Sequence, residues 1–175
     1  PMGYIIAKQL HLPLEVVLSK KIGHPSHKEF AIGAVTLKSQ VLSEVAKEVS
    51  KSYIDEETKK IRTLLTKRYQ DYYGNKKPKE LKDKILIIVD DGIATGNTIL
   101  STIEMLHEEQ PKKIIVAIPV SSQSAIQKLK DTPFVDEVIC LSTPENFRAV
   151  GQFYKNFDQV DDIEVKTYLN KVMVI

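Results

Sequence analysis

The 175-residue sequence contains a single cysteine, Cys140, so no disulfide can form within the chain, as is usual in a reducing cytoplasm. Its place in an apolar run predicts a small buried side chain. No apolar run reaches the roughly 18 residues that a membrane-spanning helix needs, and no secretory signal is visible, so we expect no membrane partner. The formal net charge is only +2, with basic residues spread along the chain, which argues against extensive contact with nucleic acid. The 42% hydrophobic content and the length suit one domain with a hydrophobic core.

Several motifs of nucleotide binding and catalysis are also absent. No G-x-x-x-x-G-K-[ST] loop occurs, which on the simplest interpretation excludes a P-loop NTPase. No G-x-S-x-G elbow occurs, so Ser121 and Ser122 are better interpreted as a helix cap than as a nucleophile. The four histidines lack the spacing of metal ligands on a helix face (His11, His24, His27 and His107).

The most informative stretch is residues 85–98. It opens with Ile-Leu-Ile-Ile-Val, an apolar run typical of a parallel strand buried on both faces. The strand ends at Asp90 and Asp91, and a turn containing Gly92 and Gly96 leads into a helix from about Thr98. In open α/β sheets, ligands bind beyond the carboxyl ends of the strands, and a helix N-terminus suits a phosphate. The layout therefore predicts a sugar phosphate, with the acids binding vicinal hydroxyls or metal-bound water. The alternative is a solvated acidic turn. An aspartyl phosphatase does not fit, because it would need its second acid where Gly92 stands.

The rest of the chain is read as alternating strands and helices. In the second half, strands at 85–89, 113–119 and 135–141 and helices at 98–109 and 122–130 predict right-handed crossovers and a parallel sheet. In the first half we expect a helix at 3–12, a strand at 14–19 and a hairpin-like strand at 30–37. Residues 41–49 are ambiguous. A long helix is expected at 55–73, capped by Ser52 or Asp55 and stopped at Gly74, and a final short helix at 161–169.

The sequence Val-Asp-Asp-Gly-Ile-Ala-Thr-Gly-Asn-Thr, residues 89–98, resembles the phosphoribosyl pyrophosphate (PRPP) signature of type I phosphoribosyltransferases. The resemblance extends over essentially the whole chain and is closest to the predicted phosphoribosyltransferase subgroup. It implies an α/β fold with a central, mostly parallel β-sheet flanked by helices. It also implies one domain over residues 1–175, with hood elements at about 41–78 and 143–175. Asp90 and Asp91 would bind the ribose and, indirectly, Mg²⁺. The 5′-phosphate would be bound by the loop that follows, which consists of Ala94, Thr95, Gly96, Asn97 and Thr98.

The first residues resemble the pyrophosphate loop of this family, which in the subgroup often reads Pro-Arg-Gly-Gly. Met2 replaces the arginine, a strong anion ligand, and Tyr4 replaces a glycine that permits close approach of a ligand. Met2 and Gly3 are nevertheless the positions that the resemblance assigns to pyrophosphate. The sequence opens without a leading methionine and without the strand that normally holds this loop, so it starts inside a longer protein or represents a short form.

Two lysines are further candidates for contact with pyrophosphate. Lys20 and Lys21 follow the strand expected at 14–19, so they should lie at the same sheet edge as Asp90. Lysine there would neutralise charge without requiring bidentate geometry. The alternative is a solvated basic turn. A basic segment at 67–69 is interpreted mainly as the solvated face of a helix, with a mobile active-site loop as the alternative.

The acceptor base stays open. Where 6-oxopurine phosphoribosyltransferases usually have an aspartate, this chain has Ala94, which cannot exchange a proton, so hypoxanthine or guanine salvage is disfavoured. Residues 144–154 resemble the C-terminal segment of the subgroup, where Phe147 or Phe153 could stack on a base or serve as core or dimer contacts. Ile93, in the signature itself, is a third candidate for contact with the base.

The resemblance implies a cytoplasmic enzyme of nucleotide and nucleoside metabolism that acts as a homodimer or another homo-oligomer. With Mg²⁺ it would transfer the phosphoribosyl group of PRPP to an unidentified nitrogenous base and release pyrophosphate, mainly by positioning and electrostatics. One alternative is a non-catalytic regulator that binds PRPP or a nucleotide, which the altered first loop supports. Another is a degenerate copy retained as a dimer partner.

Overall fold

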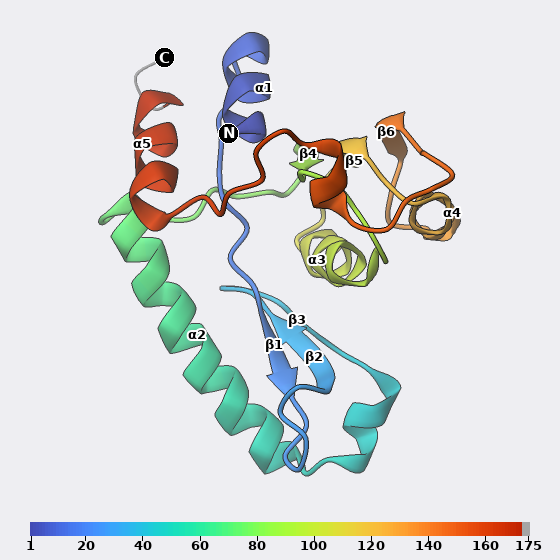
Figure 1. Ribbon diagram of the computed structural model, residues 1–175. Coiled ribbons are helices and arrows are strands. Elements are labelled where there is room, and N and C mark those ends of the chain that lie inside the picture. The colour runs from blue at the N-terminus through green and yellow to red at the C-terminus, as the bar shows by residue number, and fades with distance from the viewer. Residues whose placement is uncertain (173–175) are drawn as a thin grey trace. The chain divides into compact units, whose positions relative to one another are not determined.

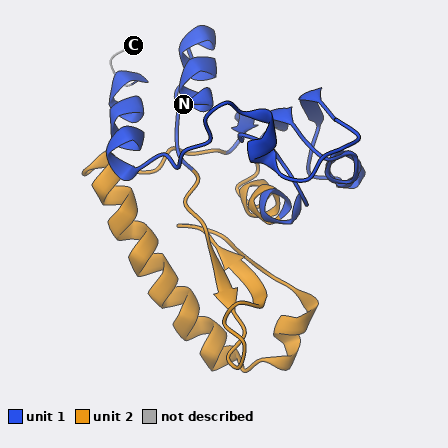
Figure 2. Cartoon of the chain, viewed as in Figure 1, with its two compact units in different colours: residues 1–16, 82–100, 111–175 blue, residues 17–81, 101–110 orange. Residues whose placement is uncertain are grey.

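The computed structural model describes residues 1–172, and these form two compact units (Figures 1 and 2). Unit 1 contains residues 1–16 and 82–100 and the chain from residue 111 onward. Unit 2 contains residues 17–81 and 101–110. The single domain and its hood elements stay a prediction.

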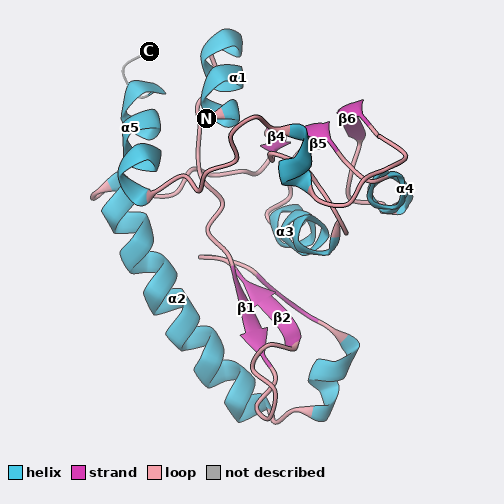
Figure 3. Ribbon diagram, viewed as in Figure 1, coloured by secondary structure: helices cyan, strands magenta, loops and turns pink. Residues whose placement is uncertain are grey.

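Unit 1 contains a parallel sheet in the order β4–β5–β6, formed by Ile85–Val89, Lys113–Val120 and Glu137–Ser142. Helix α3 (Asn97–His107) connects β4 to β5, and helix α4 (Gln123–Asp131) connects β5 to β6 and packs against β6. Figure 3 shows this alternation of strands and helices. The parallel sheet predicted for the second half of the chain is confirmed, with element ends within a few residues of those expected.

Burial in this sheet is concentrated on its middle strand. Alternate side chains of β5 are buried, at Ile114, Val116, Ile118 and Val120. Strand β4 has no fully buried residue and Ile85 is 56% exposed, so the prediction that residues 85–89 are buried on both faces is wrong. Cys140 is only half-buried, because it lies in β6, where Leu141 is 81% exposed. Both deviations have one cause, since β4 and β6 are the edge strands of the sheet that the described residues form.

Two further helices of unit 1 lie side by side (Figure 1). Helix α1 (Met2–Leu10) contacts helix α5 (Asp162–Val172), and the rings of Tyr4 and Tyr168 lie 5.2 Å apart between centroids. Both helices confirm sequence predictions. The segment between β6 and α5 contains a short 3₁₀ helix, η2 (Val150–Phe153).

Unit 2 contains an antiparallel sheet in the order β1–β2–β3, formed by Lys20–Gly23, Ala31–Val35 and Gln40–Leu42. The hairpin expected around 30–37 is confirmed, and the ambiguous segment contains β3 and the 3₁₀ helix η1 (Glu44–Glu48). The strand predicted at 14–19 is wrong. Those residues form no ladder, and pairing with β2 begins only at Lys20, opposite Val35.

The long helix α2 (Lys51–Tyr73) packs against β1 and β2 with a stripe of buried residues that includes Ile54, Ile61 and Leu65. It begins earlier than expected, because the side chain of Ser50 accepts a hydrogen bond from the backbone N–H of Tyr53. Neither proposed cap is therefore the cap. The predicted stop at Gly74 is confirmed, and residues 67–69 are helical, as the favoured interpretation has it.

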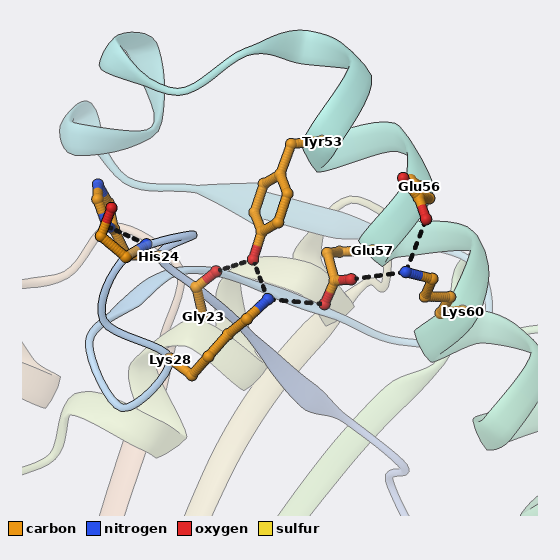
Figure 4. A network of polar contacts seen from close by, with 8 residues as sticks. Gly23, His24, Lys28, Tyr53, Glu56, Glu57 and Lys60 are labelled. Carbon is orange, nitrogen blue, oxygen red and sulfur yellow. Dashed lines mark hydrogen bonds and ion pairs between the residues drawn. The ribbon is translucent and has the colours of Figure 1, made fainter.

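A network of polar contacts links the turn after β1 to the first turns of α2 (Figure 4). The hydroxyl of Tyr53 donates to the carbonyl oxygen of Gly23 at 2.7 Å and accepts from Lys28 Nζ at 2.6 Å. Lys28 Nζ also lies 3.8 Å from a carboxylate oxygen of Glu57, which in turn pairs with Lys60 at 3.2 Å. Exposed ion pairs contribute little stability, so the hydrogen bond from Tyr53 to the carbonyl oxygen of Gly23 is the main polar contact between this turn and α2.

Across residues 1–172, the structure contains no helix with both the length and the apolar character needed to cross a membrane.

Candidate active site

Asp90 and Asp91 lie at the carboxyl end of β4, as the sequence predicts. The backbone N–H of Asp91 donates to Asp90 Oδ1 at 3.0 Å, which fixes the first carboxylate against the chain turn. Gly92, the next residue, packs closely against Val150 and Val120. A Cβ at Gly92 would lie 2.7 Å from Val150 Cγ1 and 3.0 Å from the carbonyl oxygen of Val120, so the position requires glycine.

The two carboxylates lie in surroundings that disfavour negative charge. Burial raises the pKa of Asp90, and the neighbouring carboxylate of Asp91 raises it further, against the effect of the Asp91 N–H. Burial also raises the pKa of Asp91, although backbone N–H groups oppose this. Asp90 still presents an exposed surface, so its desolvation is partial. Donor hydroxyls or a cation at this pair would relieve the unfavourable charge.

The loop after the acids leads directly into a helix. Gly96 has a φ of 80°, a left-handed conformation that glycine adopts without strain, and α3 begins at the next residue. The carbonyl of Gly96 accepts from Leu100 N at 3.0 Å, which closes the first turn. Residues 94–98 therefore form a short loop that ends on a helix N-terminus, the arrangement predicted for phosphate binding.

Two serines after β5 fasten this loop. The hydroxyl of Ser122 donates to the carbonyl oxygen of Ala94 at 2.6 Å, and that of Ser121 donates to the carbonyl oxygen of Ile93 at 3.1 Å. Ser122 also caps α4 by accepting from Ala125 N at 3.1 Å, which confirms the predicted cap. Their contacts with the loop were not predicted, although two serines directly after a buried strand were a usable signal.

Lys128, on α4, also holds the loop at 94–98, and nothing in the sequence indicates this contact. Its Nζ donates to the carbonyl oxygen of Thr95 at 3.0 Å and to Asn97 Oδ1 at 3.2 Å. No motif marks this lysine among the 25 basic residues of the chain. Its charge lies next to the loop to which the resemblance assigns a phosphate.

Tyr154 links the C-terminal segment to the acidic pair. Its hydroxyl donates to the carbonyl oxygen of Asp91 at 2.5 Å and lies 3.9 Å from Met2 Sδ. Burial and the charges of Asp91 and Asp90 raise the pKa of Tyr154, so the phenol stays protonated and keeps donating. This contact brings the last residue of the segment 144–154 to the acidic pair.

The three residues considered for contact with a base differ in their accessibility. The rings of Phe147 and Phe153 stack on each other with centroids 5.5 Å apart, and Phe153 is 39% exposed. Ile93 is only 4% exposed, so a base would reach little of its side chain. Contact of these residues with a base stays a prediction.

Met2 and Gly3 do not form the expected loop. Both lie in the first turn of α1, where Ile5 N donates to the carbonyl oxygen of Pro1 at 3.1 Å. The helix starts here because neither residue interrupts it, and Tyr4 is held by its ring contact with Tyr168. The helix predicted at 3–12 thus begins one residue earlier, and the contact of Met2 and Gly3 with pyrophosphate stays a prediction. Met2 Sδ lies 3.9 Å from the Tyr154 hydroxyl that donates to Asp91.

Lys20 and Lys21 belong to β1 of the antiparallel sheet in unit 2, so their predicted position at the end of a strand in the sheet of Asp90 is wrong. Lys21 Nζ pairs with Glu29 Oε2 at 2.9 Å and also donates to the carbonyl oxygen of Glu29 at 3.0 Å. An apolar run before the lysines suggested a strand, but the ladder that forms starts at the lysines themselves. Their role toward pyrophosphate stays a prediction.

Asp90 and Asp91 are also the candidate ligands for a metal ion. Among residues 1–172 there is no group of three or more His, Cys, Asp or Glu side chains placed to hold a metal ion. Mg²⁺ keeps several waters and binds through one or two carboxylates together with substrate phosphates, and it prefers oxygen ligands. Asp90 and Asp91 fit such an ion, which would be held jointly with a substrate.

The structure thus has the strand, acidic pair, loop and helix in the order that the resemblance to phosphoribosyltransferases predicts. A family model described as "Phosphoribosyl transferase domain" matches residues 1–157, so the chain belongs to this family. The predicted family and fold class are thereby confirmed.

Individual relatives agree with this assignment. A protein of Mycobacterium tuberculosis named "Putative phosphoribosyl transferase Rv0571c" is 31% identical over 177 residues, which is 98% of this chain but only 39% of that protein. The chain thus spans less than half of that relative. The uracil phosphoribosyltransferase of Mycoplasma genitalium is 38% identical over 65 residues, 37% of this chain and 32% of that enzyme. The crystal structure of TT1426 from Thermus thermophilus superposes with a TM-score of 0.80 at 35% identity, covering 96% of this chain and 80% of that one.

Proposed function

We propose that this chain binds PRPP with Mg²⁺ and transfers the 5-phosphoribosyl group to a nitrogenous base, releasing pyrophosphate. The observation that carries the proposal is the acidic pair at the end of β4, followed at once by a loop with left-handed Gly96 and the N-terminus of α3. Each part has a chemical counterpart in PRPP, namely vicinal hydroxyls for the acids and a phosphate for the loop.

The roles of the residues follow from their positions. Asp90 and Asp91 accept hydrogen bonds from the ribose hydroxyls, and the N–H groups and hydroxyls of residues 94–98 bind the 5′-phosphate. Ser122 and Lys128 hold this loop by its carbonyl oxygens, so that the N–H groups face the ligand without reorganisation. Mg²⁺, when bound, would neutralise the departing pyrophosphate.

The acceptor is proposed only as a class. Ala94 gives the loop no acid–base group, which suits a base that needs no proton exchange at that position. Uracil is the first base to test, because a relative named for it aligns with part of this chain. A homodimer in the cytoplasm is part of the same proposal, and the single cysteine is compatible with that compartment.

Calorimetric titration with PRPP and Mg²⁺ tests the proposal. The wild type should bind in the micromolar range, and Asp90→Asn/Asp91→Asn should lose the signal. Glu80→Gln/Asp158→Asn is the matched control, since it removes the same two charges from exposed carboxylates that form no ion pair within residues 1–172. No binding by folded wild type, or equal loss in the control, would overturn the proposal.

A second candidate is a non-catalytic regulator that binds PRPP or a nucleotide. It is favoured by the helical conformation of Met2 and Gly3, because the backbone that the resemblance assigns to pyrophosphate forms the first turn of α1. Release of pyrophosphate in the presence of a panel of bases separates the two candidates. Binding without release for every base would favour the regulator.

A further inference from the structure

Unit 2 has a groove along helix α2 that the proposed function does not use. Its volume is about 820 Å³, which is within the range of small-molecule sites. Side chains of α2 line it, together with Gln40 at the start of β3, and no apolar side chain is among them. A lining of hydroxyls, amides and charged groups suits a polar ligand.

The charged residues of the groove are predominantly basic. Lys59, Arg62 and Lys67 line it, and Asp55 is the one acid among the lining residues. Within residues 1–172, neither Lys59 nor Lys67 forms an ion pair with a carboxylate. The groove therefore carries positive charge that the described protein does not neutralise.

Two buried polar atoms at the groove have no hydrogen-bond partner in the described structure, Thr58 Oγ1 and Arg62 Nε. Thr58 is only 6% exposed. Of the guanidinium donors of Arg62, Nη2 donates to the carbonyl oxygen of Lys38 at 3.3 Å. Buried donors nearly always have a partner, and an unmade bond costs free energy. Both atoms are enclosed by protein, so the groove offers a ligand its charged lining residues rather than these two atoms.

The surroundings of Lys60 on α2 differ from those of the groove lysines. Lys60, next to Lys59 in sequence, pairs with Glu56 at 2.7 Å and with Glu57 at 3.2 Å (Figure 4). Adjacent lysines on one helix thus have different surroundings, one neutralised and one facing the groove. The basic composition of α2 alone does not explain why, among the described residues, Lys60 is paired with carboxylates and Lys59 is not. Lys60 is therefore a matched control for substitution of the groove lysines.

We propose that this groove binds a phosphorylated small molecule of nucleotide size. Arg62, Lys59 and Lys67 line the groove, and their positive charge would attract the phosphate oxygens of the ligand. All lining residues belong to unit 2, whereas the acidic pair and residues 94–98 belong to unit 1. The groove thus shares no residue with the site proposed for the transferase, and the proposal does not rest on that activity.

Backbone amide NMR of the full chain, titrated separately with tripolyphosphate and with ATP, tests the proposal. Saturable shifts are expected in residues 55–70. Arg62→Gln and Lys67→Gln should each weaken binding about tenfold or more, whereas Lys60→Gln should stay within about twofold. Tighter binding of ATP would show that the nucleoside contributes, and equal binding would show that phosphates suffice. Shifts confined to residues 94–98, no shifts, or equal loss in Lys60→Gln would overturn the proposal.

A second variant guards against misfolding of the arginine mutant. Thr66→Glu places a negative charge in the groove at an exposed helical position and removes no contact of Thr58 or Arg62. It should keep the wild-type circular dichroism and the PRPP affinity of unit 1 but lose the shifts in residues 55–70. Unchanged binding of tripolyphosphate by a folded Thr66→Glu protein would refute the site.

Discussion

Replacing Ser122 by alanine removes three interactions of one hydroxyl, two with backbone groups and one with Ser124 Oγ. Ser122 Oγ donates to the carbonyl oxygen of Ala94 at 2.6 Å and accepts from Ala125 N at 3.1 Å. The first bond holds the loop proposed to bind phosphate, and the second caps helix α4. The side chain is half-buried, so water replaces it only in part.

The expected cost follows from these two bonds. Loss of an N-cap costs about 1 kcal/mol, and loss of a neutral hydrogen bond costs about 1 kcal/mol net. Because one oxygen makes both, the terms are not independent, and we expect about 1.5–2 kcal/mol in total. This corresponds to roughly a tenfold to thirtyfold shift in the folding equilibrium, whereas the bond to Ala94 alone would shift release of the loop about fivefold.

Hydrogen exchange and urea unfolding measure this cost. Amides of residues 94–98 and of the first turn of α4 should exchange faster in Ser122→Ala, and the unfolding midpoint should fall. Ser122→Thr keeps a hydroxyl and should restore most of the difference. Ser124→Ala is the control, since it removes the 3.2 Å bond between the hydroxyls of Ser124 and Ser122 and keeps both bonds of Ser122 to the backbone. A loss below about 0.5 kcal/mol, or faster exchange in α4 alone, would refute the role of Ser122 in fastening the loop.

Three further predictions concern the same site. Gly96→Ala should cost about 1 kcal/mol in urea unfolding, because an alanine at φ 80° is strained although its Cβ would meet Ala125 at an ordinary 3.5 Å; no loss would refute this. Asp90→Asn/Asp91→Asn should be more stable than wild type at neutral pH, because burial raises the folded-state pKa of both carboxyl groups. The wild type is then stabilised by protonation below the unfolded pKa and loses that stability as the pH rises through the folded pKa. The difference in unfolding free energy should vanish below about pH 4, and a less stable variant at neutral pH would contradict the prediction. Tyr154→Phe should cost about 1 kcal/mol and weaken PRPP binding, because the carbonyl oxygen of Asp91 loses its donor; unchanged unfolding and affinity would contradict this.

The sequence predicted those elements whose signal lies within one segment. Predictions were wrong where the position of a strand depends on its pairing with a distant segment. The run at 85–89 was recognisable as a parallel strand, but its place at the edge of the described sheet depends on the strand order. The run before Lys20 has the composition of a strand, yet the ladder forms one step later, because β-propensity describes only how well a residue fits a sheet that other segments supply.

The same distinction holds for the candidate site. Asp90, Asp91 and the loop through Thr98 are contiguous, so a motif identifies them. Ser122 and Lys128 act on that loop from α4 and its cap, about 30 residues later, and Tyr154 reaches the carbonyl of Asp91 from beyond β6. Only the parallel crossover connecting β5 to β6 brings them there, and no spacing in the sequence encodes those contacts.

The acidic pair shows why a purely structural explanation of this edge is insufficient. Two adjacent carboxylates whose pKa values are both raised by burial cost the folded chain free energy at neutral pH. Asparagine would keep a carbonyl acceptor for the Asp91 N–H without that cost. Stability alone would therefore favour the amides, and residues that oppose stability are expected where a ligand makes use of them. Hydroxyl donors or a hydrated Mg²⁺ would gain binding free energy at this pair, because the carboxylates they meet are already partly desolvated. The Asn variant should thus gain stability and lose PRPP in one step, an outcome that a solvated acidic turn would not produce.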